Sequence, residues 1–278
     1  MKHKQGEAGF HLVAILLAVV VLGVVCFVGW RVFADKKSTV RQASTPNSQS
    51  TRQDSSKPTP TPVDPNQPPV KLKTIGINLD AYNPATNHAG DFIFTKADVL
   101  LGLILAPYGQ VIPGNSANGY KDKTNPQPEF RVPMGTNVQS LIDGYVTDVP
   151  KLYSNDYSVM VSPVKGEKNW VYETEHVINV LVKPGDQVKA GQVIAQVSPH
   201  NKVSYNGLGL VELGILHGGN PPRHVCPFAY LDDSIKADVQ KKLLAFFKSW
   251  EDYRGDSSLY DEANMEVPGC LTLDPVNG

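Results

Sequence analysis

The chain has 278 residues and a formal net charge of −1 at pH 7. Because the charges balance and no basic run lies beyond the segment that follows the first hydrophobic stretch, nucleic acid is not expected as a partner. The sequence has neither a Gly-x-Gly-x-x-Gly nor a phosphate-loop pattern, so the usual fingerprints of nucleotide cofactors are excluded.

An uncharged apolar run, LVAILLAVVVLGVVCFVGW, fills residues 12–30. At about 1.5 Å per residue it spans roughly a 30 Å hydrocarbon core. We therefore expect a transmembrane anchor over residues 12–33, preceded by a cytoplasmic N-terminus over residues 1–11. A cleaved signal peptide is the alternative, but its apolar region is usually shorter and ends at a small-residue site. Cleavage of the prepilin type would rest on Gly9, Phe10 and Leu12 alone, because Ala14 stands where that motif has Glu.

The orientation of the anchor depends on two conflicting signals. The flanking positive charges favour a C-terminal part on the cytoplasmic side, because more of them follow the apolar run than precede it. Those before it are Lys2 and Lys4, and those after it are Arg31, Lys36, Lys37 and Arg41. Long domains, however, cross membranes largely regardless of flanking charge. Cys26 lies in the apolar run, which leaves Cys226 and Cys270 as a pair. One disulfide in an oxidising compartment is predicted, with two unrelated buried thiols as the alternative. We expect a single-pass protein of the cell membrane whose C-terminal domain is extracytoplasmic.

Residues 34–70 are predicted to be a disordered linker. From Ser38 to Val70 the segment is rich in Ser, Thr, Gln and Pro, a composition that buries too little apolar surface to offset the entropy of ordering. It would hold the following domain several nanometres from the membrane, a spacing that suits work in the cell wall.

Residues 71–278 are predicted to form one mainly β domain. Short strands bounded by Gly, Pro and Asp turns favour an all-β barrel or sandwich; the segments are 130–132, 138–142, 145–149, 158–161, 177–183, 192–197 and 210–216. The pattern Val-x-x-Gly-x-x-Val occurs twice, at 132–138 and 182–188. Two such hairpins packed face to face would close a small barrel.

A C-terminal amphipathic helix is predicted over residues 234–253. Apolar residues recur there at steps of three and four: Ile235, Val239, Leu243, Phe246, Phe247 and Trp250. This face is expected to pack on the β domain; binding of a partner protein is the alternative.

The stretch from 125 to 215 resembles the lysostaphin-like zinc endopeptidases, which cut peptide cross-links in bacterial cell walls. The resemblance is carried by Gly135-Thr136, by the hairpin Asp143-Gly144-Tyr145-Val146, and by the segment 182–194, VKPGDQVKAGQVI. It implies a barrel-sandwich-hybrid β domain with its core at about residues 125–231. Biotinyl carriers and membrane-fusion adaptors share the second hairpin, but the chain lacks the carrier's lysine motif and the adaptor's coiled-coil helices.

The resemblance also implies a site, with substituted residues. The family holds zinc with His, Asp and His, and the matching positions carry Asn125, Glu129 and Glu212; Leu210 replaces a further His. These oxygen donors suit Mg²⁺, Ca²⁺ or Mn²⁺ better than zinc, so one divalent ion and no ion both remain open.

His176 falls where the family has its general base or transition-state stabiliser, although a structural His hydrogen-bonded to a neighbouring carboxylate is the simpler interpretation. Glu173 and Glu175 should share one face of a strand. A second candidate metal site, His217 with His224, competes with the pairing of Cys226.

Three functions follow from these residues. The first is a membrane-anchored protein of the cell envelope whose substituted peptidase domain binds or scaffolds peptidoglycan. The second is an active metallopeptidase with a rearranged metal site. The third is an interaction module that binds another envelope protein. Whether the chain is an enzyme stays open at this stage.

Overall fold

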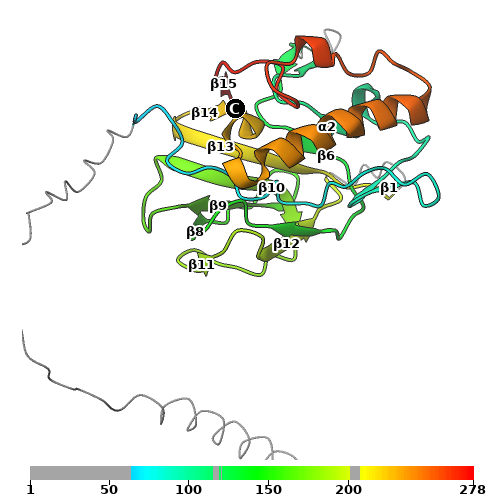
Figure 1. Cartoon of the computed structure of the whole chain (residues 1–278). Coiled ribbons are helices and arrows are strands. Elements are labelled where there is room, and N and C mark those ends of the chain that lie inside the picture. The colour runs from blue at the N-terminus through cyan, green and yellow to red at the C-terminus, as the bar shows by residue number, and fades with distance from the viewer. Residues whose placement is uncertain (1–63, 115–118, 120, 201–206) are drawn as a thin grey trace, which may run out of the picture. The chain divides into compact units, whose positions relative to one another are not determined.

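The structure is a computed structural model, which describes residues 64–114, 119, 121–200 and 207–278 (Figure 1). The predicted N-terminus over residues 1–11 and the anchor over 12–33 lie outside the described residues, as does most of the 34–70 linker. Among the residues that are described, no helix is long and apolar enough to cross a membrane.

One large sheet organises the domain. Its main path is β11-β8-β9-β10-β13-β14-β15, and each pair of neighbouring strands on this path is antiparallel. The strands of this path are β8 (Gly144–Asp148), β9 (Tyr157–Ser162), β10 (Trp170–Ile178), β11 (Gln187–Val188), β13 (Val211–Gly219), β14 (Pro222–Val225) and β15 (Val276–Asn277). Four further strands branch from it, namely β3 (Leu105–Ala106), β6 (Glu129–Phe130), β7 (Asn137–Gln139) and β12 (Val193–Val197).

The branches extend the two central strands. Strand β12 pairs with β10 and β7, and β6 pairs with β13 and β3. Two small sheets lie apart, β1 (His88–Ala89) with β2 (Phe92–Ile93), and β4 (Val111–Ile112) with β5 (Lys123–Thr124). Short 3₁₀ helices cover Leu100–Gly102, Pro227–Tyr230 and Glu262–Asn264.

The expected closed barrel is wrong. Among the described residues the pairings form a branched, open sheet, because β7 and β11 each pair on one side only. The mainly β fold with one C-terminal helix is confirmed.

The internal repeat forms two interlocked turns. Gly135 and Gly185 occupy the same position in the two copies and both have positive φ, 82° and 93°, which a residue with a side chain adopts at a cost. The copies then exchange partners, since β7 of the first pairs with β12 of the second and β8 pairs with β11.

The strand predicted over 177–183 is confirmed only at residues 177 and 178, and the rest of that prediction is wrong. The chain is instead extended over β10, Trp170–Ile178, and leaves the sheet at Asn179, whose φ is 48°. Strand β10 carries Glu173, Glu175 and His176 at largely buried positions, so its sequence lacks the apolar pattern of a central strand.

Helix α2 covers Asp233–Arg254, close to the predicted 234–253. The Asp232 side chain accepts from Ser234 N at the N-terminus, and Gly255 ends the helix in a left-handed conformation. Its buried residues pack on aromatic rings of the β domain; Phe246 lies 4.6 Å from Phe92 between ring centroids. The apolar face is therefore part of the core and is not available to a partner.

A disulfide joins Cys226, just after β14, to Cys270 in the C-terminal tail, with their Cα atoms 6.0 Å apart. The predicted pairing is confirmed. At the other end of the domain, Pro65 O accepts from Trp170 Nε1 at 3.3 Å and Val70 O accepts from Tyr172 Oη at 2.5 Å. The folded part thus includes the last residues assigned to the linker.

Candidate functional site

A β-bulge in β10 gives His176 its position. Thr174 pairs with Val159 of β9, and Val177 pairs with Tyr157. Between these two pairs the chain advances by three residues on β10 but by two on β9, so β10 has one extra residue there. His176 lies in this bulge with φ 60°, a conformation uncommon for residues other than glycine. In regular alternation residue 176 would face away from Glu173 and Glu175. The bulge brings its ring towards Glu212 on the neighbouring strand β13.

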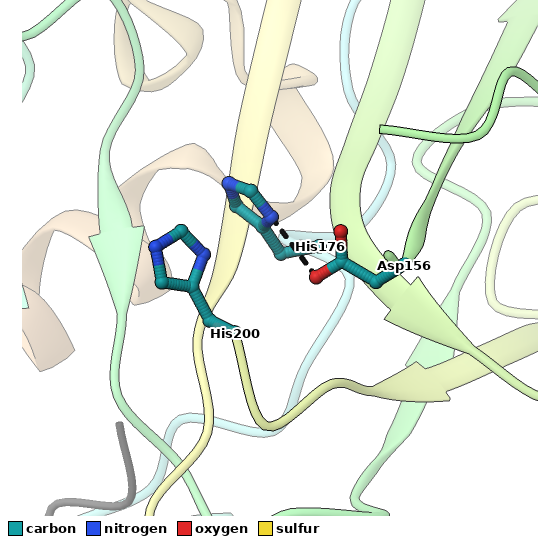
Figure 2. Close-up of side chains that lie close together, drawn as sticks. All are labelled: Asp156, His176 and His200. Carbon is teal, nitrogen blue, oxygen red and sulfur yellow. Dashed lines mark hydrogen bonds and ion pairs between the residues drawn. The ribbon is translucent and has the colours of Figure 1, made fainter. Parts of the chain in front are cut away.

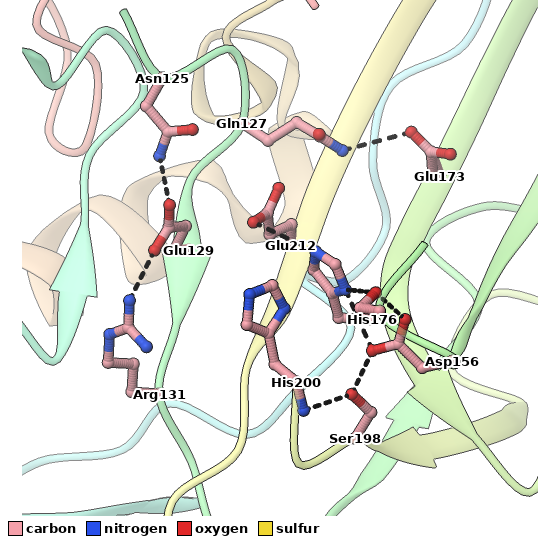
Figure 3. Close-up of polar contacts among 11 residues, drawn as sticks. Asn125, Gln127, Glu129, Arg131, Asp156, Glu173, His176, Ser198, His200 and Glu212 are labelled. Carbon is pink, nitrogen blue, oxygen red and sulfur yellow. Dashed lines mark hydrogen bonds and ion pairs between the residues drawn. The ribbon is translucent and has the colours of Figure 1, made fainter. Parts of the chain in front are cut away.

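His176 is held by a buried polar cluster (Figure 3). Its Nδ1 lies 3.1 Å from Asp156 Oδ2 and 3.3 Å from Ser154 Oγ, and its Nε2 lies 3.7 Å from Glu212 Oε1. The hydroxyls of Ser154 and Ser198 both donate to Asp156. These hydrogen bonds lower the pKa of Asp156 against the effect of burial, so the carboxylate is ionised beside the imidazole.

Two of the expected ligand positions face each other across a strand pair. Glu129 on β6 and Glu212 on β13 are direct partners in the antiparallel register. Asn125 lies just before β6 and donates through Nδ2 to Glu129 Oε1 at 3.2 Å. Arg131 donates from Nη2 to Glu129 Oε2 at 3.0 Å, and both side chains are buried. The structure thus brings Glu129, Glu212 and His176 into one neighbourhood.

Burial raises the pKa of three carboxyl groups in this neighbourhood, those of Glu129, Glu175 and Glu212. Burial raises the pKa of Glu129, opposed chiefly by the Arg131 charge. Burial, followed by the charges of Glu129 and Glu175, raises the pKa of Glu212 well above its usual range. Burial also raises the pKa of Glu175.

The substituted residues do not fit the family's zinc. Each oxygen of Glu129 already accepts from an N–H group, of Asn125 on one side and Arg131 on the other. The guanidinium supplies a permanent positive charge next to Glu129, where a metal ion would otherwise balance the carboxylates. The residues at these positions therefore do not support metal-dependent catalysis of the family's kind.

Glu173 occupies a separate buried position on the same face. It accepts from Ser158 Oγ at 2.5 Å and from Gln127 Nε2 at 3.3 Å (Figure 3). Gln127 reaches it over Gly214, where a Cβ atom would stand 2.7 Å from Gln127 Nε2. Burial, and then the charge of Glu175, raise the pKa of Glu173 to about 8.

Several residues of the cluster were not predicted. Asp156, Ser154, Ser198 and His200 lie in turns with no family motif, and nothing in their spacing announces them. Arg131 did give a signal, because an arginine inside the short strand predicted over 130–132 needs a buried partner.

His217 and His224 do not converge on a metal site in the structure. His217 stacks on Trp170 with ring centroids 4.3 Å apart, and Cys226 is taken by the disulfide. The group of metal-ligating side chains that does converge within the described residues is Asp156, His176 and His200.

Comparison with known proteins bears on the fold. The model of peptidase family M23 matches residues 128–213. This stretch of the chain is therefore similar to the M23 peptidases, and the resemblance expected from the sequence is confirmed there. A comparison with curated proteins found no match.

Solved structures give weaker likenesses. The catalytic domain of the prophage-encoded M23 protein EnpA from Enterococcus faecalis, solved as a point mutant, is 23% identical over 39% of this chain and 80% of its own, with a TM-score of 0.32. Lysostaphin, solved in solution, is 18% identical over 34% of this chain, with a TM-score of 0.29. The chain spans 38% of that lysostaphin structure. A complex of SpoIIIAH and SpoIIQ matches at 16% identity over 58% of this chain and 96% of its own, with a TM-score of 0.34. At these values the likenesses carry no argument about activity.

Proposed function

We propose that the chain is a membrane-anchored protein of the cell envelope whose M23 domain binds or scaffolds peptidoglycan without cleaving it. The observation that carries the proposal is the state of the ligand positions. Glu129 accepts from Arg131 at 3.0 Å and from Asn125 at 3.2 Å, so this candidate ligand is already paired with a fixed cation. The peptidoglycan ligand is taken from the family that the domain matches.

The anchored, external placement rests on two supports. The apolar run 12–30 is long enough to span a bilayer, and the Cys226–Cys270 disulfide suits an oxidising compartment. The Ser/Thr/Pro-rich linker then gives the domain the reach to contact the wall.

The test is sedimentation of the purified full-length chain with isolated peptidoglycan, with free amino groups measured in the supernatant. We expect the chain to sediment with the wall material and to release no new amino groups, with or without chelator. Release that chelator abolishes would overturn the proposal in favour of the active metallopeptidase. A chain that stays in the supernatant would also overturn it.

A surface variant sharpens the binding test. Tyr153 is 80% exposed and directly precedes Ser154, whose hydroxyl lies 3.3 Å from His176 Nδ1. Replacing Tyr153 with Ala should weaken sedimentation by about tenfold, the loss typical of an aromatic contact residue. Leu181→Ala, at another exposed apolar position in a different segment, is the matched control and should bind as wild type.

A further inference from the structure

We propose that Asp156, His176 and His200 form a binding site for a divalent transition metal, with zinc as the ion they suit best. This site is distinct from the three substituted ligand positions Asn125, Glu129 and Glu212. It does not depend on the proposed function, because it concerns other side chains and a measurement other than wall binding.

The three donors converge from separate parts of the chain (Figure 2). Asp156 precedes β9, His176 lies in the β10 bulge, and His200 follows β12. One ligand atom from each lies within 4.8 Å of the other two. Two imidazoles and one carboxylate form a donor set that zinc commonly takes in proteins.

The backbone holds both histidines in unusual conformations. His176 has φ 60° and His200 has φ 43°. Each such residue costs on the order of 1 kcal/mol or more and persists where its surroundings require it, often at functional positions. Both imidazole donors thus have strained backbones, and their rings stand edge to face with centroids 4.1 Å apart.

His200 also has an unused polar atom. Its Nδ1 is buried and finds no hydrogen-bond partner in the described part of the chain. A buried group left in this state costs roughly 1–3 kcal/mol. An ion bound by the imidazole would remove that cost.

The surroundings are those of metal ligands. Ser154 and Ser198 donate to Asp156 and fix the carboxylate, and the His200 backbone N–H donates to Ser198 Oγ at 2.9 Å. An ion on His176 Nδ1 would replace the hydrogen bond to Asp156 and leave the ring proton on Nε2. That nitrogen faces Glu212 Oε1 at 3.7 Å, which is beyond hydrogen-bond distance.

The experiment titrates the metal-free full-length chain with Co²⁺, which reports coordination by its visible absorption, and then with Zn²⁺ by calorimetry. We expect one equivalent of Co²⁺ to bind with d–d bands and to be displaced by Zn²⁺. His200→Ala should weaken the affinity by at least about tenfold. If circular dichroism shows that the alanine variant is unfolded, His200→Gln takes its place, because it keeps the size of the side chain. It should weaken the affinity by the same factor.

A matched variant locates the ion. His217→Ala removes an imidazole outside the cluster and should change the affinity by less than about twofold. The proposal fails if wild type takes up no stoichiometric Co²⁺, or if both His200 variants bind as wild type. It also fails if His217→Ala abolishes binding while the His200 variants retain it.

Discussion

At the scale of single residues, Arg131 and Glu129 form a buried ion pair beside Glu212. Breaking a buried pair leaves an uncompensated charge and typically costs 3–5 kcal/mol. Arg131→Met should therefore lower the free energy of unfolding by roughly 3 kcal/mol, measured by urea denaturation of the full chain.

The double variant tests the origin of that loss. In Glu129→Gln with Arg131→Met no buried charge is left behind, so part of the stability should return. If the unfolding free energy of Arg131→Met is within about 0.5 kcal/mol of the wild-type value, the ion pair does not stabilise the fold as proposed.

Glu173 predicts a pH dependence of stability. Its folded pKa is about 8, above its usual value, because of burial and the Glu175 charge. The folded state therefore keeps a proton that the unfolded chain loses near pH 4.5. The stabilisation from this bound proton is present in full below the unfolded pKa and is lost as the pH rises to about 8. The unfolding free energy falls by about 1.4 kcal/mol for each pH unit between the two pKa values.

Glu173→Gln separates this residue from the other carboxyls. The amide stays neutral, so the fall in unfolding free energy between pH 5 and pH 8 should be reduced, and the variant should be more stable than wild type at pH 8. Parallel stability curves for the two proteins across this range would show that Glu173 is not the group responsible.

At the scale of elements, α2 offers two adjacent leucines with opposite environments. Leu243 is fully buried and Leu244 is 43% exposed. Leu243→Ala should destabilise the domain by about 2–5 kcal/mol through lost burial and the cavity left behind. Leu244→Ala should change the unfolding free energy by less than about 0.5 kcal/mol, and equal effects of the two would contradict the packing of this helix.

The same helix shows what the sequence could predict. Its amphipathic period and its cap at Asp232 lie within one stretch of chain, so local rules identify it to within one residue at each end. The glycine turns of the repeat were also visible locally. The exchange of partners between the two copies depends on pairing across some fifty residues, which periodicity does not encode.

Strand β10 shows where such reasoning fails. Its buried Glu173 and His176 are satisfied by side chains from other elements, Ser158, Gln127 and Asp156. The family motif pointed to Glu129, Glu212 and His176. In the structure Glu212 lies opposite Glu129 in the strand register and close to the His176 ring. It could not reveal the bulge that turns His176, or the Asp156 and His200 side chains, because these arise from tertiary contacts.

At the scale of the whole molecule, the disulfide closes a loop that contains α2. Cys226 and Cys270 are 44 positions apart, and the loss of such a cross-link is expected to cost about 2–4 kcal/mol through the greater freedom of the unfolded chain. The double variant Cys226→Ser with Cys270→Ser should show this loss in urea denaturation. Reduction of wild type should give the same loss, whereas Cys26→Ser should give none.

The state of this pair in the cell tests the placement of the domain. Disulfides persist in oxidising compartments and are rare where glutathione keeps thiols reduced. If the domain faces outward, non-reduced digests of the protein from its native compartment should contain the Cys226–Cys270 cross-linked peptide and little free thiol at either position. Labelling of both thiols before any reduction would place the domain on the inner side, which is the side that the charges flanking residues 12–30 favour. Because the fold and the ligand positions are the same on either side, that outcome would remove the wall as the partner while leaving the metal-binding inference standing.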